Sequence, residues 1–148
     1  MICRVLSLTE KKQICMNNFA LDTNILIYSH DENAVNKQNI ARDLIIRSPV
    51  VCTQVVSEYI SILKRFLNIN KAMIINACLP NLKHCRIQAV DILTLQTAER
   101  LIHHYNFQLF DAIIIASALE NDCQTLYSED MQHKMKIDKQ LSIINPFL

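Results

Sequence analysis

Four acidic residues of this 148-residue chain stand where predicted strands end or predicted helices begin, the positions at which α/β proteins place their reactive groups. Carboxylates crowded into one site repel one another, and a divalent cation removes that repulsion. Their hard oxygen atoms suit Mg²⁺ or Mn²⁺, which can activate a bound water and offset the charge that develops on a phosphoryl group. The four residues are Asp22, Glu58, Asp111 and Asp130.

Each of these carboxylates also has a purely structural explanation. Asp22 and Asp111 can act as N-caps, because a carboxylate accepts hydrogen bonds from the free amides of a helix. Glu58 can be a solvated residue at the margin of an apolar helix face, and Asp130 can be a turn residue. Capping and solvation do not explain why all four carboxylates lie near the ends of predicted strands or the starts of predicted helices. We therefore interpret them as one candidate site.

Two adjacent carboxylates, Glu129 and Asp130, follow the predicted strand 124–128. Side chains alternate between the two faces of an extended segment, so Asp130 points the same way as Ser128. We therefore favour Asp130 for the site and leave open whether Glu129 contributes to it.

The elements that must position these residues alternate between strands and helices. Short apolar or β-branched runs predict buried strands, and apolar residues at helical spacing between them predict helices. This alternation predicts one α/β domain around a mainly parallel sheet. Pro80 is expected to end the helix that precedes it. The expected strands are 19–21, 50–53, part of 87–93, 124–128 and 141–145. A first helix is expected to begin at residue 25, and the further helices are expected at about 34–47, 55–66, 70–79, 95–105 and 112–119.

The composition excludes several classes of protein. Apolar residues make up 51% of the chain and charged residues 20%, which allows a full core and argues against intrinsic disorder. The apolar runs are far shorter than the roughly 18 residues of a membrane span. The chain has no glycine, which excludes the dinucleotide fingerprint, the P-loop, the kinase loop and the G-x-S-x-G elbow. Left-handed turn positions are then expected at Asn or Asp.

The start of the sequence shows no signal peptide, because Glu10, Lys11 and Lys12 stand where an apolar stretch would be. Six cysteines are scattered along the chain without a C-x-x-C pair, so we expect free thiols and a cytoplasmic location. We expect residues 1–15 to form an N-terminal extension outside the fold and residues 16–148 to form the domain.

The net charge of +1 gives no overall basic signature, but the charges are unevenly distributed. No acidic residue occurs between Tyr59 and Val90. A local basic surface can bind phosphates even when the whole chain is neutral, although a solvated helical face explains the same residues. The basic residues of this stretch are Lys64, Arg65, Lys71, Lys83 and Arg86.

Four segments, in their order along the chain, resemble the PIN-domain ribonucleases, and specifically the VapC-type toxins of toxin–antitoxin pairs. They are Phe-Ala-Leu-Asp-Thr-Asn-Ile-Leu-Ile-Tyr at 19–28, Val-Val-Ser-Glu-Tyr at 55–59, Phe-Asp-Ala-Ile-Ile-Ile-Ala-Ser-Ala at 110–118 and Leu-Tyr-Ser-Glu-Asp-Met at 126–131. The resemblance implies a three-layer α/β/α sandwich and Mg²⁺- or Mn²⁺-dependent endonucleolytic cleavage of RNA. Phe110 stands where Tyr or Trp is common in the family, a difference that leaves the acidic groups untouched.

The resemblance also implies roles for individual residues. It makes Asp22 and Asp111 metal ligands, while Glu58 and Asp130 complete the pocket directly or through water. Supporting residues would orient a carboxylate or a water, or brace the site. These are Thr23, Asn24 and Ser128.

The same resemblance implies partners: an RNA substrate such as tRNA, a small antitoxin protein that covers the groove, and a second copy of the chain bound through a helical face. With RNA as substrate, the basic residues between Tyr59 and Val90 become candidates for phosphate contacts. Two other functions stay open. One is a catalytically silent domain of the same fold that binds RNA or protein, whose signature would be a missing acidic residue. The other is a metal-dependent hydrolase of small phosphoesters, for which an Asp-x-Asp motif would be expected where Asn24 stands.

Overall fold

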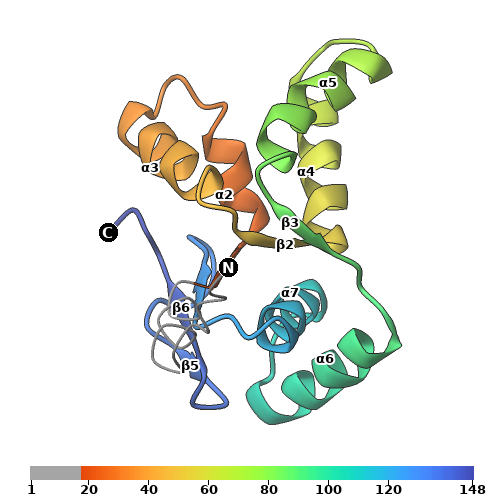
Figure 1. The fold of residues 1–148 in the computed structure, drawn as a ribbon, viewed down its shortest axis with the longest axis vertical. Helices are drawn as coiled ribbons and strands as arrows, with labels where there is room; N and C mark the ends of the chain where they lie inside the picture. The colour runs from red at the N-terminus through yellow and green to blue at the C-terminus, as the bar shows by residue number, and fades with distance from the viewer. Residues whose placement is uncertain (1–17) are drawn as a thin grey trace, which may run out of the picture.

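A six-stranded sheet forms the centre of the computed structural model, which describes residues 18–148 (Figure 1). The predicted extension, residues 1–15, lies outside the described residues, so its boundary with the domain stays a prediction. The strands are β1 (Phe19–Leu21), β2 (Val50–Cys52), β3 (Arg86–Gln88), β4 (Thr125–Tyr127), β5 (Lys136–Ile137) and β6 (Leu141–Ile144). They lie in the order β3-β2-β1-β4-β6-β5, and all pairs are parallel except β5 with β6.

Helices cover both faces of this sheet, as expected for a three-layer α/β/α sandwich. They are α2 (Thr23–Tyr28), α3 (Val35–Ile45), α4 (Thr53–Phe66), α5 (Lys71–Leu82), α6 (Ile92–Tyr105) and α7 (Leu109–Glu120). Helices α2 to α5 lie on one side, and α6 and α7 lie on the other (Figure 1). From β1 to β3 the chain adds strands toward one edge of the sheet, and from β3 it returns past β1 to β4. Because crossovers between parallel strands are right-handed, this reversal places the later helices on the opposite face of the sheet.

This reversal creates a switch point between β1 and β4, the place where open α/β sheets bind their ligands. Leu21 at the end of β1 pairs with Tyr127 at the end of β4. The amide of Asp22 donates a hydrogen bond of 3.0 Å to the carbonyl of Tyr127, which fixes the two strand ends together. The residues that follow β1 and β4 are therefore neighbours, although about a hundred residues of chain separate them.

The core follows from the apolar pattern of the helices. In α7, every residue from Ala112 to Ala118 is buried, because this helix packs between α6 and the strands β2 and β4. In α4, the buried residues Val55, Tyr59 and Leu63 recur every four positions and form one face. Within residues 18–148, none of the helices combines the length and apolar character that a bilayer crossing requires.

Pro80 does not end its helix, so that expectation is wrong. Helix α5 continues to Leu82, and the amide of Lys83 still donates to the carbonyl of Leu79 at 2.9 Å. The side chain of Asn81 explains the persistence of this last turn, because it donates to the hydroxyl oxygens of Ser29 and Tyr59 at 2.8 and 2.9 Å. Tertiary hydrogen bonds thus outweigh the bond that proline cannot make.

The left-handed turn positions only partly follow the expectation of Asn or Asp. Asn106, Asp122 and Asp138 have positive φ as expected, with Asn106 ending α6. Ser48 and Lys134 also have positive φ, as does Lys139 in the turn between β5 and β6. Without glycine, tight connections leave these residues in a conformation that costs about 1–2 kcal/mol each.

Replacing Ile115 by Ala is expected to lower the free energy of unfolding by about 2–5 kcal/mol, because its fully buried side chain would leave a cavity in α7. Ile92→Ala is the matched control, since this isoleucine is 70% exposed and should change the free energy by about 0.5 kcal/mol or less. Urea unfolding followed by circular dichroism measures both values. Similar losses in the two variants would contradict the assignment of α7 to the core.

Candidate functional site

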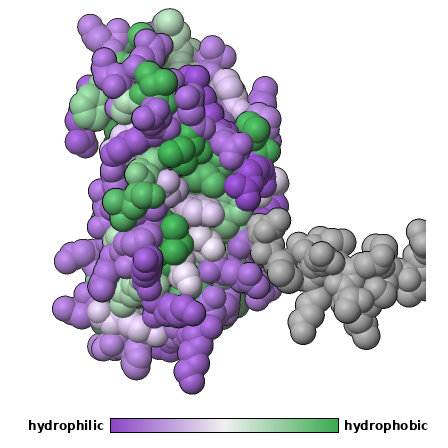
Figure 2. Space-filling view, turned by 90° about the vertical axis from the view of Figure 1, so that its left-hand side faces the viewer, coloured by the Kyte–Doolittle hydropathy of each residue, from purple (hydrophilic) through white to green (hydrophobic). Residues whose placement is uncertain are grey.

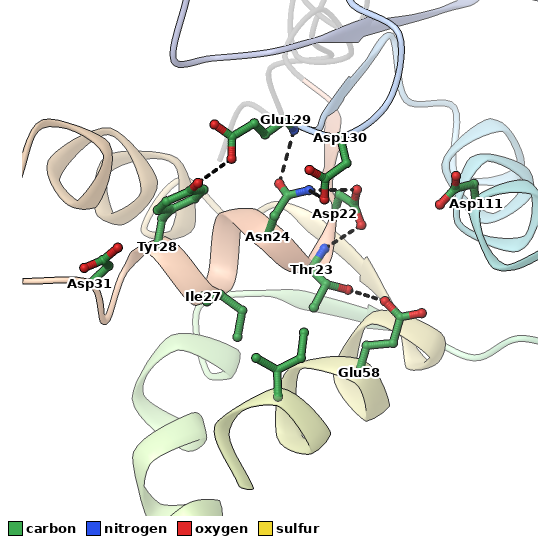
Figure 3. A pocket seen from close by; sticks show the side chains of 11 residues that line it. Asp22, Thr23, Asn24, Ile27, Tyr28, Asp31, Glu58, Asp111, Glu129 and Asp130 are labelled. Carbon is green, nitrogen blue, oxygen red and sulfur yellow. Dashed lines mark hydrogen bonds between the residues drawn. The ribbon is translucent and has the colours of Figure 1, made fainter. Parts of the chain in front are cut away.

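A pocket of about 390 Å³ opens at the carboxyl ends of β1 and β4 (Figure 3). It brings together side chains from α2, α4, α7 and the loop after β4. The pocket is lined by Asp22, Thr23, Asn24, Ile27, Tyr28, Asp31, Glu58, Ile62, Asp111, Glu129 and Asp130. All four acidic candidates of the sequence therefore line a single cavity, at the switch point of the sheet.

Asp22 is the most buried of these carboxylates, with 6% of its surface exposed. One oxygen, Oδ1, accepts a hydrogen bond of 2.7 Å from the amide of Thr23 and so caps α2. The other, Oδ2, accepts from the Ser128 hydroxyl at 2.7 Å and from the Asn24 amide at 3.1 Å. Asp22 is thus both a helix cap and a pocket residue, because its two oxygens serve different partners.

Burial raises the pKa of Asp22 to about 6, against hydrogen bonds from Ser128 and Thr23 that lower it, and the charges of Asp111 and Glu58 raise it further. Burial also raises the pKa of Asp111, followed by the charges of Glu58 and Asp130. Each ion pair found within residues 18–148 involves other acidic residues. No ion pair of the described part therefore neutralises the four candidate carboxylates, Asp22, Glu58, Asp111 and Asp130.

Asn24 links two of the carboxylates across the switch point. Its Nδ2 donates at 3.1 Å to Asp22 Oδ2 and also at 3.1 Å to Asp130 Oδ2. Its Oδ1 accepts a hydrogen bond of 3.2 Å from the amide of Glu129. This one amide side chain fastens the loop after β4 to α2 and directs Asp130 toward Asp22 (Figure 3).

Glu58 projects into the pocket from the second turn of α4. The hydroxyl of Thr23 donates to Glu58 Oε2 at 2.7 Å, and Gln54, one turn earlier in α4, donates to Oε1 at 2.8 Å. Both carboxylate oxygens are therefore held in place by neutral donors.

Asp111 does not cap α7, so the structural alternative for this residue is wrong. The helix begins at Leu109 with Gln108 as its N-cap, which places Asp111 in the first turn. The two residues before Asp111 are exposed, and the residues after it are buried, so Asp111 stands at the boundary of the core. Its side chain points toward the other carboxylates of the pocket (Figure 3).

Glu129, the neighbour left open by the sequence, lies at the rim of the pocket and faces Tyr28 (Figure 3). Its carboxylate forms an ion pair with Lys37 and accepts a hydrogen bond from the Tyr28 hydroxyl. The carboxylate oxygens of Glu129 are thus already bonded to Lys37 and Tyr28 rather than directed at the four candidate carboxylates.

Four lining residues were not singled out as site residues from the sequence. Ile62 lies one turn after Glu58 in α4, and the other three are Ile27, Tyr28 and Asp31. These three share one face with Asn24, because positions three, four and seven residues further on project from the same side of a helix. Turn hydrogen bonds continue this geometry past the end of α2, where the amide of Asp31 donates to the carbonyl of Tyr28 at 3.1 Å. This periodicity is the signal that could have identified them.

Of the basic candidates, Lys64 and Arg65 lie in the last turn of α4, the helix that carries Glu58. Arg65 comes seven residues after Glu58, which places it on the same side of the helix and roughly 10 Å further along the axis. Lys71 begins the next helix, α5. All three are exposed and lie on the two helices that extend beyond the pocket.

Arg86 lies at the opposite end of the sheet, where β3 begins. Its Nε donates to the carbonyl of Ser48 at 3.0 Å, and its guanidinium also contacts the side chain of Asn18. Lys83 caps the end of α5, three residues before β3. The structure does not bring these two residues to the acidic pocket.

The donors of the pocket are carboxylate oxygens, together with the amide and hydroxyl groups of Asn24 and Thr23. Such ligands fit hard cations such as Mg²⁺ or Mn²⁺, which keep several of their waters. In residues 18–148, no three His, Cys, Asp or Glu side chains form a ready-made metal cluster. A cation in this pocket would therefore be bound partly through water, or after small rotations of the carboxylates.

The raised pKa of Asp22 predicts a pH-dependent stability. Since the pKa rises from 3.8 to about 6 on folding, stability is lost as the pH increases through 6. Between pH 5 and pH 8, wild type without divalent cations should lose about 1.5 kcal/mol relative to Asp22→Asn. Urea unfolding in EDTA at the two pH values measures this difference. Parallel pH profiles for the two proteins would contradict it.

Comparison with known proteins places the fold. The sequence pattern of the PIN domain matches residues 19–137. A toxin–antitoxin complex from Klebsiella pneumoniae is similar, with a TM-score of 0.65 at 17% identity over 88% of this chain and 98% of that chain. VapC20 of Mycobacterium tuberculosis, a toxin that cleaves the sarcin-ricin loop, gives 0.60 at 19% identity over 76% and 90% of the two chains.

VapBC2 from Rickettsia felis, bound to a DNA fragment from its promoter, gives a TM-score of 0.64 at 15% identity over 86% of this chain and 98% of that chain. No curated protein sequence matches the chain significantly. At these identities the solved structures show a shared fold. Because the family pattern spans most of the chain and the sheet and helices follow the fold of these toxins, the chain belongs to the PIN domain family.

Proposed function

We propose that this protein is a Mg²⁺- or Mn²⁺-dependent endoribonuclease and the toxin of a type II toxin–antitoxin pair. The observation that carries the proposal is the convergence of four carboxylates from separate segments on one pocket. Their charge has no basic partner in the described part of the chain, which favours a divalent cation. Membership of the PIN domain family supports the same chemistry.

In this proposal Asp22 and Asp111 hold the cation, and Glu58 and Asp130 complete its surroundings directly or through water. When bound, a divalent cation supplies a water of lowered pKa and offsets the charge that builds up on the phosphate. An acidic pocket could not otherwise accept a phosphodiester, because both carry negative charge.

The remaining residues hold the carboxylates in place. The amide of Thr23 donates to one carboxylate oxygen of Asp22, and the hydroxyl of Ser128 donates to the other. Together these two hydrogen bonds fix the orientation of the carboxylate. The hydroxyl of Thr23 fixes Glu58 at 2.7 Å, so one residue orients two carboxylates from the start of α2. Preorganised ligands of this kind lose little conformational freedom when a cation or substrate binds.

The RNA path is proposed to run from the pocket along α4, where Lys64 and Arg65 follow Glu58. Basic side chains next to an acidic pocket bind the phosphates that flank the cleaved bond, and they add no sequence preference. Arg65 is the stronger candidate, because it lies on the same side of α4 as Glu58.

The partner proposals rest on exposed apolar side chains and on the solved complexes. Leu109 and Phe110, directly before Asp111, are 59% and 53% exposed. Large exposed apolar residues beside a functional pocket indicate an interaction surface. We propose that a small antitoxin covers the pocket from this side and that a second copy of the chain binds through a helical face, as the Klebsiella pneumoniae structure is itself a toxin–antitoxin complex.

Asp111→Asn is expected to reduce cleavage of total RNA in Mg²⁺ or Mn²⁺ by about 100-fold or more, because a lost cation ligand removes several kcal/mol of transition-state stabilisation. EDTA should abolish the wild-type activity. Gel analysis of the RNA measures cleavage, and Asp122→Asn, at an exposed aspartate beyond the opposite end of α7 from Asp111, is the matched control.

Expression of wild type should also arrest growth, and Asp111→Asn should relieve the arrest. Cleavage that survives both EDTA and the substitution would overturn the cation-dependent reaction. Hydrolysis of p-nitrophenyl phosphate without cleavage of RNA would instead favour the phosphoesterase, and RNA binding without hydrolysis would favour the silent domain.

The position of Arg65 predicts a specific effect on RNA affinity. In an Asp111→Asn background, Arg65→Gln should weaken RNA binding and reduce the slope of log affinity against log salt by about one. Arg86→Gln is the matched control and should leave both unchanged, because Arg86 lies at the other end of the sheet. Fluorescence anisotropy at several KCl concentrations measures both quantities, and equal effects of the two substitutions would reject the proposed path.

A further inference from the structure

Glu129 lies between Ser128 and Asp130 in the sequence, but its carboxylate bonds to a different group of side chains. Its carboxylate pairs with Lys37 of α3 and accepts a hydrogen bond from the hydroxyl of Tyr28, at the end of α2. Lys37 Nζ also donates to the Tyr28 hydroxyl at 3.2 Å. The three side chains therefore form a closed triangle that connects two helices to the loop after β4.

Aromatic rings surround the positive corner of this triangle. Lys37 Nζ lies 4.6 Å from the centroid of the Tyr28 ring and 5.2 Å from that of Phe147, and the two rings pack edge to face at 4.9 Å. Figure 2 shows the face that carries α3 and the C-terminus, where apolar side chains gather across the middle between hydrophilic ends. With 35% and 24% of their side chains exposed, Lys37 and Glu129 are better shielded than a typical surface pair.

The main chain of Glu129 is fixed at the same time. Its amide donates to Asn24 Oδ1 at 3.2 Å, while the residues on either side bond to the side chains of Asp22 and Asn24. Ser128 donates to Asp22 at 2.7 Å, and Asp130 accepts from Asn24 at 3.1 Å (Figure 3). Any rotation of the Glu129 backbone would therefore move a partner of Asp22 and a carboxylate of the pocket together.

We propose that Glu129, held by Lys37, is a positioning residue that keeps Ser128 directed at Asp22 and Asp130 directed into the pocket. It contacts neither the cation nor the RNA, because its carboxylate is already bonded to Lys37 and Tyr28. The inference rests on the proposed cation-dependent function, since it concerns how the cation pocket is held. It assigns to α3, which lines no part of the pocket, an influence on cation affinity.

Three accounts of Glu129 differ in the sign of their effects. If Glu129 is a positioning residue, Glu129→Gln and Lys37→Met both weaken cation binding. If Glu129 is itself a ligand, Lys37→Met frees its carboxylate and strengthens binding. If only the net charge matters, removing the acid weakens and removing the lysine strengthens binding, and high salt suppresses both effects.

Isothermal titration of purified protein with Mn²⁺ in 0.5 M KCl distinguishes these accounts. Each single variant is expected to bind Mn²⁺ about tenfold more weakly than wild type, a typical loss for a residue that supports metal ligands. The double variant should bind no more weakly than either single variant, because both remove the same constraint. Glu99→Gln and Lys136→Met, at exposed sites on α6 and β5, are the matched controls.

The exchanged pair Lys37→Glu with Glu129→Lys provides a rescue, and it should recover affinity to within about threefold of wild type. Thermal unfolding by circular dichroism checks that each variant is folded at the titration temperature. Tighter binding by Lys37→Met, wild-type affinity in both single variants, or no recovery in the exchanged pair would overturn the positioning role while leaving the proposed function intact. Failure of wild type to bind Mn²⁺ would overturn the proposed function and this inference with it.

Discussion

The surrounding structure has to accommodate several carboxylates that are brought together, and in part buried, in one pocket at the ends of β1 and β4. Burial holds the pKa of Asp22 at about 6, and the charges of Asp111 and Glu58 add to that rise. The ionised carboxylate is disfavoured by about 3 kcal/mol relative to an unfolded chain. This net cost already includes the hydrogen bonds from Ser128 and Thr23, which lower the pKa. The same burial and repulsion that oppose folding make the binding of a divalent cation favourable.

The topology explains why this charge accumulates at one place. The order β3-β2-β1-β4 leaves the ends of β1 and β4 open between the two helical layers, and right-handed crossovers bring α4 and α7 to the same edge. The chain does this without a single glycine. A helix cap at Asp22 and side-chain bonds from Asn24 fasten the strand ends, and the fold matches solved toxins at only 15–19% identity.

The sequence predicted the elements whose apolar pattern is local, and it failed where distant contacts decide. The strands 19–21 and 141–145 and the helices before and after 50–53 lie within a few residues of their expected bounds. The two-residue strand β5 has too few residues to show a pattern, and Asn81 holds the helical turn at Pro80 through partners elsewhere in the chain.

For the site, too, local sequence was sufficient to predict some features and insufficient for others. Residue type and position at the ends of elements were enough to select four of the six acidic residues that line the pocket, while Asp31 was missed and Glu129 was left open. The orientation of Glu129 depends on Lys37 in another helix, and the distance of Arg86 from the pocket depends on strand direction. Neither could be derived from local sequence.

Anomalous diffraction from crystals soaked in Mn²⁺ locates the cation without relying on activity. We expect an anomalous peak between the carboxylates of Asp22 and Asp111, with Glu58 and Asp130 within reach of the waters bound to the cation. A crystal in which Mn²⁺ binds only at other residues, with no peak in the pocket, would contradict this expectation.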